Sequence, residues 1–359
     1  MLSRSLRRPV AAASLATALA LLATGCASGD KPVAAVSAGS SSTAQPGQGV
    51  TVRIGYQLIP NADLVVKNQQ LLEKALPGAT IKWVKFDSGG DLNTAIVAGS
   101  IDLGLAGSSP VTKGLTAPLN IPYKVLWIHD VIGDNEQLVA RNASGITDVK
   151  GLVGKKVGTP FGSTSHYSLL AALALAGVAP SSVKIVDLQP QDALAAWKRG
   201  DIDAAYVWTP VLAELQKDGK VLASSGELAK QGKATYDLGV VTNAFAAAHP
   251  DIVKVWVQQE DAAVSKLKAN DAEAVASVGK ELELTVEQAT EQLKLVILLT
   301  AKEQTAAAYL GTVDKPGGLA DNLLSAAQFL LTQKAIDAVP DRSVFAAGLD
   351  VKDLSGAVG

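Results

Sequence analysis

The chain has 359 residues, of which 48% are hydrophobic and 18% charged, and its formal net charge is −2. At about 150 residues per domain, this length predicts two lobes and a further terminal segment, while the near-neutral charge argues against nucleic acid as a partner. The single cysteine excludes an internal disulfide, and the three histidines form no i, i+4 pair, so we expect neither a metal site nor a cofactor.

Residues 1–25 have the pattern of an export signal. Three arginines precede the apolar segment 11–23, which is too short for a permanent membrane span. The segment ends at Ala23-Thr24-Gly25-Cys26, which resembles a lipobox, the site where a bacterial lipoprotein is cleaved before an acylated cysteine. We expect Cys26 to be lipidated, with a soluble exported protein as the alternative. Residues 26–49 are rich in Ser, Ala, Gly and Pro and are predicted to form a flexible tether.

Two blocks of alternating strands and helices follow the tether. The first block has predicted strands at 50–56, 80–86 and 101–106, with helices at 64–76 and 92–98. The second has predicted strands at 156–159, 183–188 and 202–208, with helices at 165–176 and 193–199. This βαβαβ order favours an α/β protein with two open, mostly parallel sheets that carry helices on both faces.

The chain beyond His249 is rich in helical patterns. A helix is predicted to begin near Pro250, and further helices at about 261–281, 285–298, 302–309 and 318–335. We therefore expect lobe 1 to comprise residues 50–137 and 242–359, the latter including a helical C-terminal wrap, and lobe 2 to comprise 138–241. In open α/β sheets, ligands bind at the carboxyl ends of the strands.

Two hydroxyl-rich segments lie where a strand ends and a helix begins, one in each block. They are Gly107-Ser108-Ser109-Pro110 and Ser163-Thr164. Ordinary helix capping explains either segment alone. Because the two occupy matching positions, we expect both helix N-termini to bind one anion through backbone N–H groups and the hydroxyls of Ser108, Ser109, Ser163 and Thr164. A sulfonate or sulfate suits such a site and needs no arginine.

Acidic residues mark the beginnings of two other strands. Glu136 and Asp237 each precede an apolar run, and solvated surface charge is the alternative explanation for both. Beside an anion site, they would hold a cation at the far end of the ligand. Trp208 ends a strand and either belongs to the core or offers its ring to an ammonium, an interaction worth roughly 0.5–2 kcal/mol. Gln57, at another strand end, can donate or accept a hydrogen bond.

Motifs of catalysis are missing from the sequence. There is no Gly-x-Ser-x-Gly elbow, no Walker A loop and no Gly-x-Gly-x-x-Gly after a strand. Ser163 and His166 lie within one helical turn, which is poor geometry for a catalytic triad. We therefore expect a binding protein and not an enzyme.

Several longer runs in the middle of the chain carry a family resemblance. They lie at 85–89, 107–110, 163–164, 166–173, 188–190, 195–208 and 218–222. Together they resemble the substrate-binding proteins of bacterial ABC importers for sulfonates, nitrate and taurine. The resemblance implies a two-lobed periplasmic-binding-protein fold of type II, which closes on its ligand by hinge bending. It also implies delivery of the ligand to a membrane permease driven by an ATPase.

The same resemblance implies roles for the candidate residues. Ser108, Ser109, Ser163 and Thr164 would hold a sulfonate, Glu136 and Asp237 an ammonium, and Gln57 and Trp208 would line the pocket. Taurine, 2-aminoethanesulfonate, carries both charges. A sulfonate without an amine would leave the two carboxylates unpaired, at a cost on the order of 1–3 kcal/mol or more per group.

The expected function is therefore that of an extracytoplasmic taurine receptor. We expect a monomer held by its lipid anchor at the outer face of the cell membrane, in the periplasm or at the cell surface. A permease and its ATPase are the expected protein partners. Receptors for another aliphatic sulfonate, an aromatic sulfonate or nitrate remain the alternatives.

Overall fold

The computed structural model describes residues 47–354. The predicted export signal, the lipidation site Cys26 and nearly all of the tether lie outside the described residues.

Five strands form the first sheet, in the order β2-β1-β3-β10-β4. They are β1 (Thr51–Tyr56), β2 (Thr80–Lys85), β3 (Leu103–Gly107), β4 (Tyr123–Val131) and β10 (Tyr236–Thr242). Strands β1, β2 and β3 are parallel, whereas β10 runs antiparallel to β3 and β4. The helices between these strands are α1 (Ala62–Asn68), α2 (Leu71–Ala75), α3 (Gly89–Val97) and α4 (Ser108–Leu115).

The second sheet has the order β7-β6-β8-β5-β9. Its strands are β5 (Glu136–Arg141), β6 (Lys156–Thr159), β7 (Lys184–Asp187), β8 (Ala204–Trp208) and β9 (Gly219–Ser224). Strand β6 is parallel to β7 and β8, and β5 is antiparallel to β8 and β9. The associated helices are α5 (Thr164–Leu175), α6 (Pro190–Arg199), α7 (Val211–Leu215) and α8 (Ser225–Ala229).

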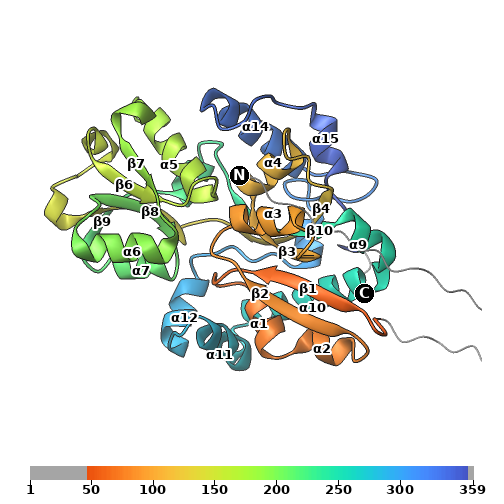
Figure 1. Cartoon of the computed structure of the whole chain (residues 1–359). Coiled ribbons are helices and arrows are strands. Elements are labelled where there is room, and N and C mark those ends of the chain that lie inside the picture. The colour runs from red at the N-terminus through yellow and green to blue at the C-terminus, as the bar shows by residue number, and fades with distance from the viewer. Residues whose placement is uncertain (1–46, 355–359) are drawn as a thin grey trace, which may run out of the picture. The chain divides into compact units, whose positions relative to one another are not determined.

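Helices cover both faces of the second sheet (Figure 1). Leu138 and Tyr206 pack with α5 on one face, while Val139 and Val207, one residue further along the same strands, pack with α6 and α7 on the other. Because alternate residues of a strand point to opposite faces, strands buried on both sides are apolar throughout. The predicted fold class, mostly parallel sheets flanked by helices, is confirmed.

Strand β10 belongs to the first sheet, although the sequence-based boundaries assign residues 236–241 to lobe 2. Its residues Leu238 and Val240 pair with Ala106 and Gly104 of β3. Every residue from Tyr236 to Val241 is buried, and the apolar run 238–241 does not by itself indicate which sheet the strand joins. The chain has therefore returned to the first sheet by residue 236.

Two helices predicted as continuous are each interrupted. The segment predicted at 64–76 forms α1 and α2, separated at Gln70, whose φ is +54°. The segment predicted at 261–281 forms the end of α10 (Pro250–Lys268) and α11 (Ala272–Glu281), separated at Asn270, whose φ is also +54°. A left-handed residue ends a right-handed helix. The remaining helices are α9 (Asn243–Ala248), α12 (Val286–Leu293), α13 (Ala301–Gln304), α14 (Leu319–Thr332) and α15 (Arg342–Ala347).

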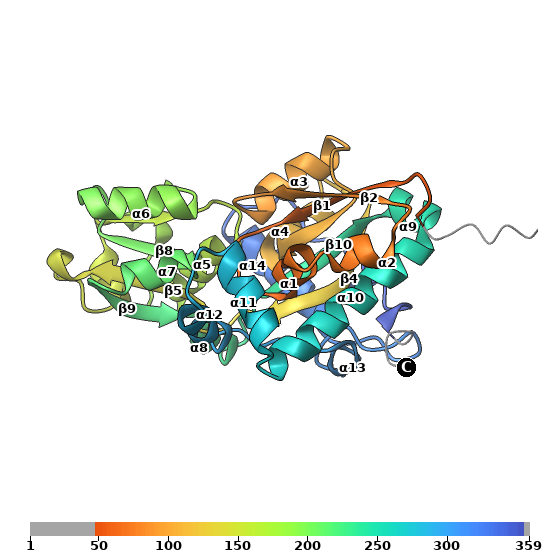
Figure 2. The same cartoon turned by 90° about the horizontal axis from the view of Figure 1, so that it is seen from below.

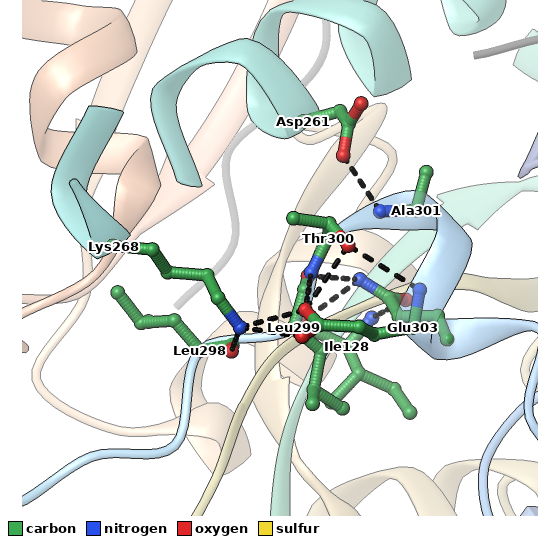
Figure 3. Close-up of polar contacts among 9 residues, drawn as sticks. Ile128, Asp261, Lys268, Leu298, Leu299, Thr300, Ala301 and Glu303 are labelled. Atoms are coloured by element: carbon green, nitrogen blue, oxygen red, sulfur yellow. Dashed lines mark hydrogen bonds and ion pairs between the residues drawn. The ribbon is translucent and has the colours of Figure 1, made fainter. Parts of the chain in front are cut away.

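The C-terminal part covers the edge of β4 and ties it to α10. Gln304 is fully buried, accepts a hydrogen bond from Ile128 N at 2.8 Å and donates one to Ile128 O at 3.0 Å. Figure 3 shows the adjoining contacts, in which Ala301 N donates to Asp261 Oδ1 at 2.6 Å and Lys268 pairs with Glu303 at 2.7 Å. The outer backbone groups of Ile128 are thus paired by a side chain, and those of Val125 and Val131 pair with backbone of the C-terminal part, so this edge is protected.

Among residues 47–354, no helix is both long enough and apolar enough to cross a membrane.

Candidate functional site

One pocket is lined by residues from both sheets, and we call it the shared pocket. Its lining includes six of the eight predicted ligand-binding residues, namely Gln57, Glu136, Ser163, Thr164, Trp208 and Asp237. The other lining residues are Ile59, Gly89, Gly107, Pro110, Ile132 and Asn135. Strands β1, β3, β6 and β8 all end at this pocket, which agrees with the rule for ligand sites in open α/β sheets. The space measures about 310 Å³, including its open part.

The N-termini of α4 and α5 meet at the shared pocket. Gly107 is the N-cap of α4, and a Cβ at this position would lie only 2.6 Å from Thr164 Cγ2, in the first turn of α5. Glycine is thus what allows the two helix starts to come so close. Each start leaves backbone N–H groups without an intrahelical partner and carries the positive end of the helix dipole. The predicted convergence of the two helices is therefore present.

Each of the four predicted hydroxyls has a protein hydrogen-bond partner: Ser109, Ser163 and Thr164 donate their protons, whereas Ser108 accepts and can still donate to an anion. Ser108 Oγ accepts a hydrogen bond from Tyr236 N at 3.2 Å, and Ser109 Oγ donates to Gly162 O at 3.4 Å. The pocket is lined by Gly107 and Pro110 on either side of these two serines.

Ser163 and Thr164 line the pocket, yet their hydroxyls are also engaged. Ser163 Oγ caps α5 by accepting from His166 N at 3.1 Å, and it donates to Pro160 O at 2.7 Å. Thr164 Oγ1 donates to Glu136 Oε2 at 2.6 Å. The groups that these helix starts can offer to an anion are therefore mainly backbone N–H groups.

Glu136 begins β5 and is 1% exposed, so the surface-charge alternative does not hold for it. Besides Thr164, its carboxylate accepts hydrogen bonds at Oε1 from Ser225 Oγ at 2.6 Å and Ser168 Oγ at 3.3 Å. Burial raises the pKa of Glu136, while the hydroxyl donors, Ser225 first, oppose that rise. The carboxylate is thus well supplied with donors from α5 and α8.

Asp237 lies on β10 and is 5% exposed. Burial, and then the charge of Glu136, raise the pKa of Asp237 to about 7. Its cross-strand neighbour on β4 is Asp130, a buried residue that the sequence analysis missed. Burial raises the pKa of Asp130 well above its ordinary value, and the charges of Asp237 and Glu136 add to the rise, so a neutral Asp130 can donate a hydrogen bond to Asp237.

The signal for Asp130 was its place in an apolar strand. An acidic residue inside a buried strand is costly unless it is paired, and Asp130 is the one acid in the run 123–131.

Trp208 and Gln57 complete the pocket wall. Trp208 pairs with Glu136 in the sheet and packs against Ile59 and Leu105, so it is both a core residue and a lining residue. Gln57 Nε2 donates to Leu105 O at 3.0 Å, which leaves its carbonyl oxygen as the group that can accept a hydrogen bond from an amine. Asn135, a lining residue that we did not select, accepts from Gly133 N at 2.7 Å.

A solute pocket between two α/β sheets, with helix N-termini and carboxylates in its wall, is the site of a periplasmic-type solute-binding protein. Residues 50–311 match the family described as the substrate binding domain of ABC-type glycine betaine transport system, and the chain belongs to this family. It is thus an extracytoplasmic substrate-binding protein of an ABC importer and not an enzyme, with a small-molecule ligand and a permease and ATPase as partners.

Among individual proteins, the chain is similar to binding proteins for taurine and for aliphatic sulfonates. The chain is 36% identical over 298 residues to the taurine-binding periplasmic protein of Escherichia coli (strain K12). This match covers 81% of this chain and 89% of that relative. It is 32% identical over 268 residues to a putative aliphatic sulfonates-binding protein of Bacillus subtilis (strain 168), covering 71% of this chain and 79% of that relative.

A solved structure shares the fold. The alkanesulfonate-binding protein SsuA from Xanthomonas axonopodis pv. citri, bound to MOPS, superimposes with a TM-score of 0.69 at 23% sequence identity, over 85% of this chain and 99% of that one. The family resemblance and the fold that it implied are confirmed.

Proposed function

We propose that the shared pocket binds taurine and that the protein delivers it to the permease of its importer. The observation that carries this proposal is that two buried carboxyl groups, Glu136 and Asp237, line the same small pocket as the N-termini of α4 and α5. Such a pocket offers partial positive charge to a sulfonate and negative charge to an ammonium.

The two carboxylates contribute unequally. Glu136 already accepts hydrogen bonds from Thr164, Ser168 and Ser225, whereas Asp237 depends on Asp130. Asp237 is therefore the principal ammonium partner. Glu136, which accepts a hydrogen bond from Thr164, adds its negative charge to the pocket. Gln57 Oε1 and the ring of Trp208 supply further favourable contacts for an ammonium.

A curated relative also supports taurine as the ligand. The relative from E. coli, which is 36% identical to this chain over 298 residues, is a taurine-binding protein.

The alternative is a sulfonate that lacks an amine. It is favoured by the three hydroxyl donors to Glu136, which satisfy that carboxylate without any ligand. It is also consistent with the relative from B. subtilis. An aromatic sulfonate or nitrate would leave Asp237 without a cationic partner in the same way.

Isothermal titration calorimetry with taurine and ethanesulfonate tests the proposal, because the two differ by the amine alone. We expect taurine to bind about 100-fold or more tightly at pH 8, which corresponds to roughly 2.7 kcal/mol. Equal affinity for the two ligands would contradict the proposal and favour the aliphatic-sulfonate alternative.

We further propose that Cys26 carries a lipid that holds the receptor at the outer face of the membrane. The support is the position of the only cysteine, directly after the apolar segment and Ala23-Thr24-Gly25. Cys26→Ala should release the protein from the membrane fraction into the soluble fraction and abolish incorporation of labelled palmitate. Membrane retention of the variant would contradict this assignment.

A further inference from the structure

Three ionisable side chains gather inside the first lobe, outside the shared pocket. Asp63 lies in α1, His129 in β4 and Glu260 in α10, and each is at most 1% exposed. We call them the buried triad. They are far apart in the sequence, so no short sequence motif contains them.

The two acids of the buried triad flank the two ring nitrogens of His129. His129 Nε2 is 3.7 Å from Asp63 Oδ2, and His129 Nδ1 is 3.7 Å from Glu260 Oε2. One ligand atom from each residue lies within 4.8 Å of the others. A direct hydrogen bond would need about 2.7–3.2 Å. Neighbouring ligands of a tetrahedral zinc ion, with bonds of about 2.1 Å, are separated by about 3.4 Å.

No protein group outside the triad satisfies it within the described residues. The carboxylate oxygens of Asp63 and Glu260 and both ring nitrogens of His129 are buried without a hydrogen-bond partner beyond the triad among residues 47–354, and within the triad only a protonated Glu260 can donate to Asp63. Buried polar groups are nearly always paired, and unpaired buried carboxylates are among the costliest groups in a fold. The imidazole adds an observation independent of the two acids, since it is fully buried, unpartnered and directed at both of them.

We infer that Asp63, His129 and Glu260 bind a divalent transition-metal ion. One imidazole nitrogen and two carboxylate oxygens form a ligand set that Zn²⁺ and its neighbours accept. The two negative charges balance a doubly charged ion, which removes the cost of burying them.

The surrounding structure holds the ligand-bearing segments in place. Ile128, next to His129, is bound on both backbone groups by Gln304, and Asp261, next to Glu260, accepts from Ala301 N (Figure 3). Helices α1 and α10 pack against each other (Figure 2). Rigid support of this kind is what a metal site needs. The ion would link α1, β4 and α10, and so stabilise the first lobe.

Because the triad is inaccessible, the ion must enter during folding. The test therefore unfolds the full chain in guanidinium with EDTA and refolds it with either Zn²⁺ or EDTA. Bound metal is counted by mass spectrometry after gel filtration, and melting is followed by circular dichroism. We expect about one Zn²⁺ per chain and a melting temperature about 5 °C or more higher than after refolding in EDTA. Refolding with Co²⁺ should give a visible absorption band that reports the coordination.

Two variants separate this site from the shared pocket. Glu260→Gln should lose the metal and its stabilisation while binding taurine as the wild type does below the melting transition. Asp237→Asn should keep the metal and lose taurine. Wild-type protein that retains no metal and melts at the same temperature in Zn²⁺ and EDTA would overturn the inference, even if Glu260→Gln does not fold. Full metal retention by Glu260→Gln would also overturn it.

Discussion

Thr164 Oγ1, in the first turn of α5, donates a hydrogen bond of 2.6 Å to Glu136 Oε2. A helix terminus suited to an anion and a carboxylate suited to a cation are therefore in direct contact, whereas the sequence analysis put them at opposite ends of the ligand. The positive end of α5 helps Glu136 to remain charged. The proposed taurine site thus depends on Asp237 for its preference for an amine, and this unequal division can be measured.

Asp237→Asn should weaken taurine binding about 100-fold and leave ethanesulfonate binding unchanged or slightly stronger. The substitution removes the charge that pairs with the ammonium and keeps the shape of the side chain. Calorimetry with both ligands at pH 8 measures the two effects. An equal loss for both ligands would show that Asp237 has only a structural role.

Glu136→Gln is the matched control for this experiment. Its three hydroxyl partners would lose a charged acceptor, so we expect lower stability, by about 1–3 kcal/mol, and similar losses of affinity for both ligands. If Glu136→Gln discriminated against taurine more strongly than Asp237→Asn, Glu136 would be the principal ammonium partner.

Taurine affinity should depend on pH through Asp237. Its pKa is about 7 without ligand, and an ammonium must lower it, because only the charged carboxylate attracts the cation. Affinity should therefore be constant above pH 7 and fall up to about tenfold for each pH unit below it. Ethanesulfonate should show the opposite trend, since protonation removes a repulsive charge.

Calorimetry at pH 6 in two buffers with different heats of ionisation checks this linkage. Close to one proton should be released for each taurine bound, because most of Asp237 is protonated in the free protein at that pH. Asp130 and Glu136 face the same region, and their pKa values are also raised by burial. Asp237→Asn should abolish the proton release, and its persistence in that variant would assign it to one of these neighbours.

Much of the shared pocket could be predicted because its residues follow strand ends. The apolar runs that end before Gln57, Gly107 and Ser163 locate three carboxyl ends of strands, and such ends meet at one edge of an open sheet. The capping residues around Gly107 and Ser163 likewise mark helix starts from local chemistry alone. Four of the six predicted lining residues, Gln57, Ser163, Thr164 and Trp208, lie at or after such strand ends, whereas Glu136 and Asp237 begin strands that reach the pocket by antiparallel pairing.

What could not be predicted depends on contacts between distant segments. That Ser108 Oγ is used by Tyr236 N follows from the pairing of β3 with β10, which no local pattern contains. The helix breaks at Gln70 and Asn270 require positive φ at residues that are not glycine, so they carry little sequence signal. The buried triad comes from three separate elements and is visible only in the fold.

Gly107→Ala should separate the two helix starts and weaken both ligands about tenfold. The new Cβ would lie 2.6 Å from Thr164 Cγ2, well inside contact distance, so α4 or α5 must shift. Thr164→Ser removes that methyl group and keeps the hydroxyl that donates to Glu136. The double variant should recover most of the lost affinity in a double-mutant cycle measured by calorimetry. Additive losses would show that the two residues do not interact.

The pH dependence of the free energy of unfolding of the ligand-free protein should also reveal the raised pKa of Asp237. Because the folded-state pKa is raised from 3.8 to about 7, the folded protein holds this proton more tightly than the unfolded chain does. The free energy of unfolding should therefore decrease as pH rises from about 4 to 7 and then level off, with a contribution on the order of 4 kcal/mol at most. Asp237→Asn removes this penalty, so the variant should be more stable than the wild type at pH 8 and similar to it at pH 4. Urea unfolding without ligand at the two pH values measures both differences. A variant that is equally destabilised at both values would mean that the Asp237 carboxyl is held by interactions stronger than its burial penalty.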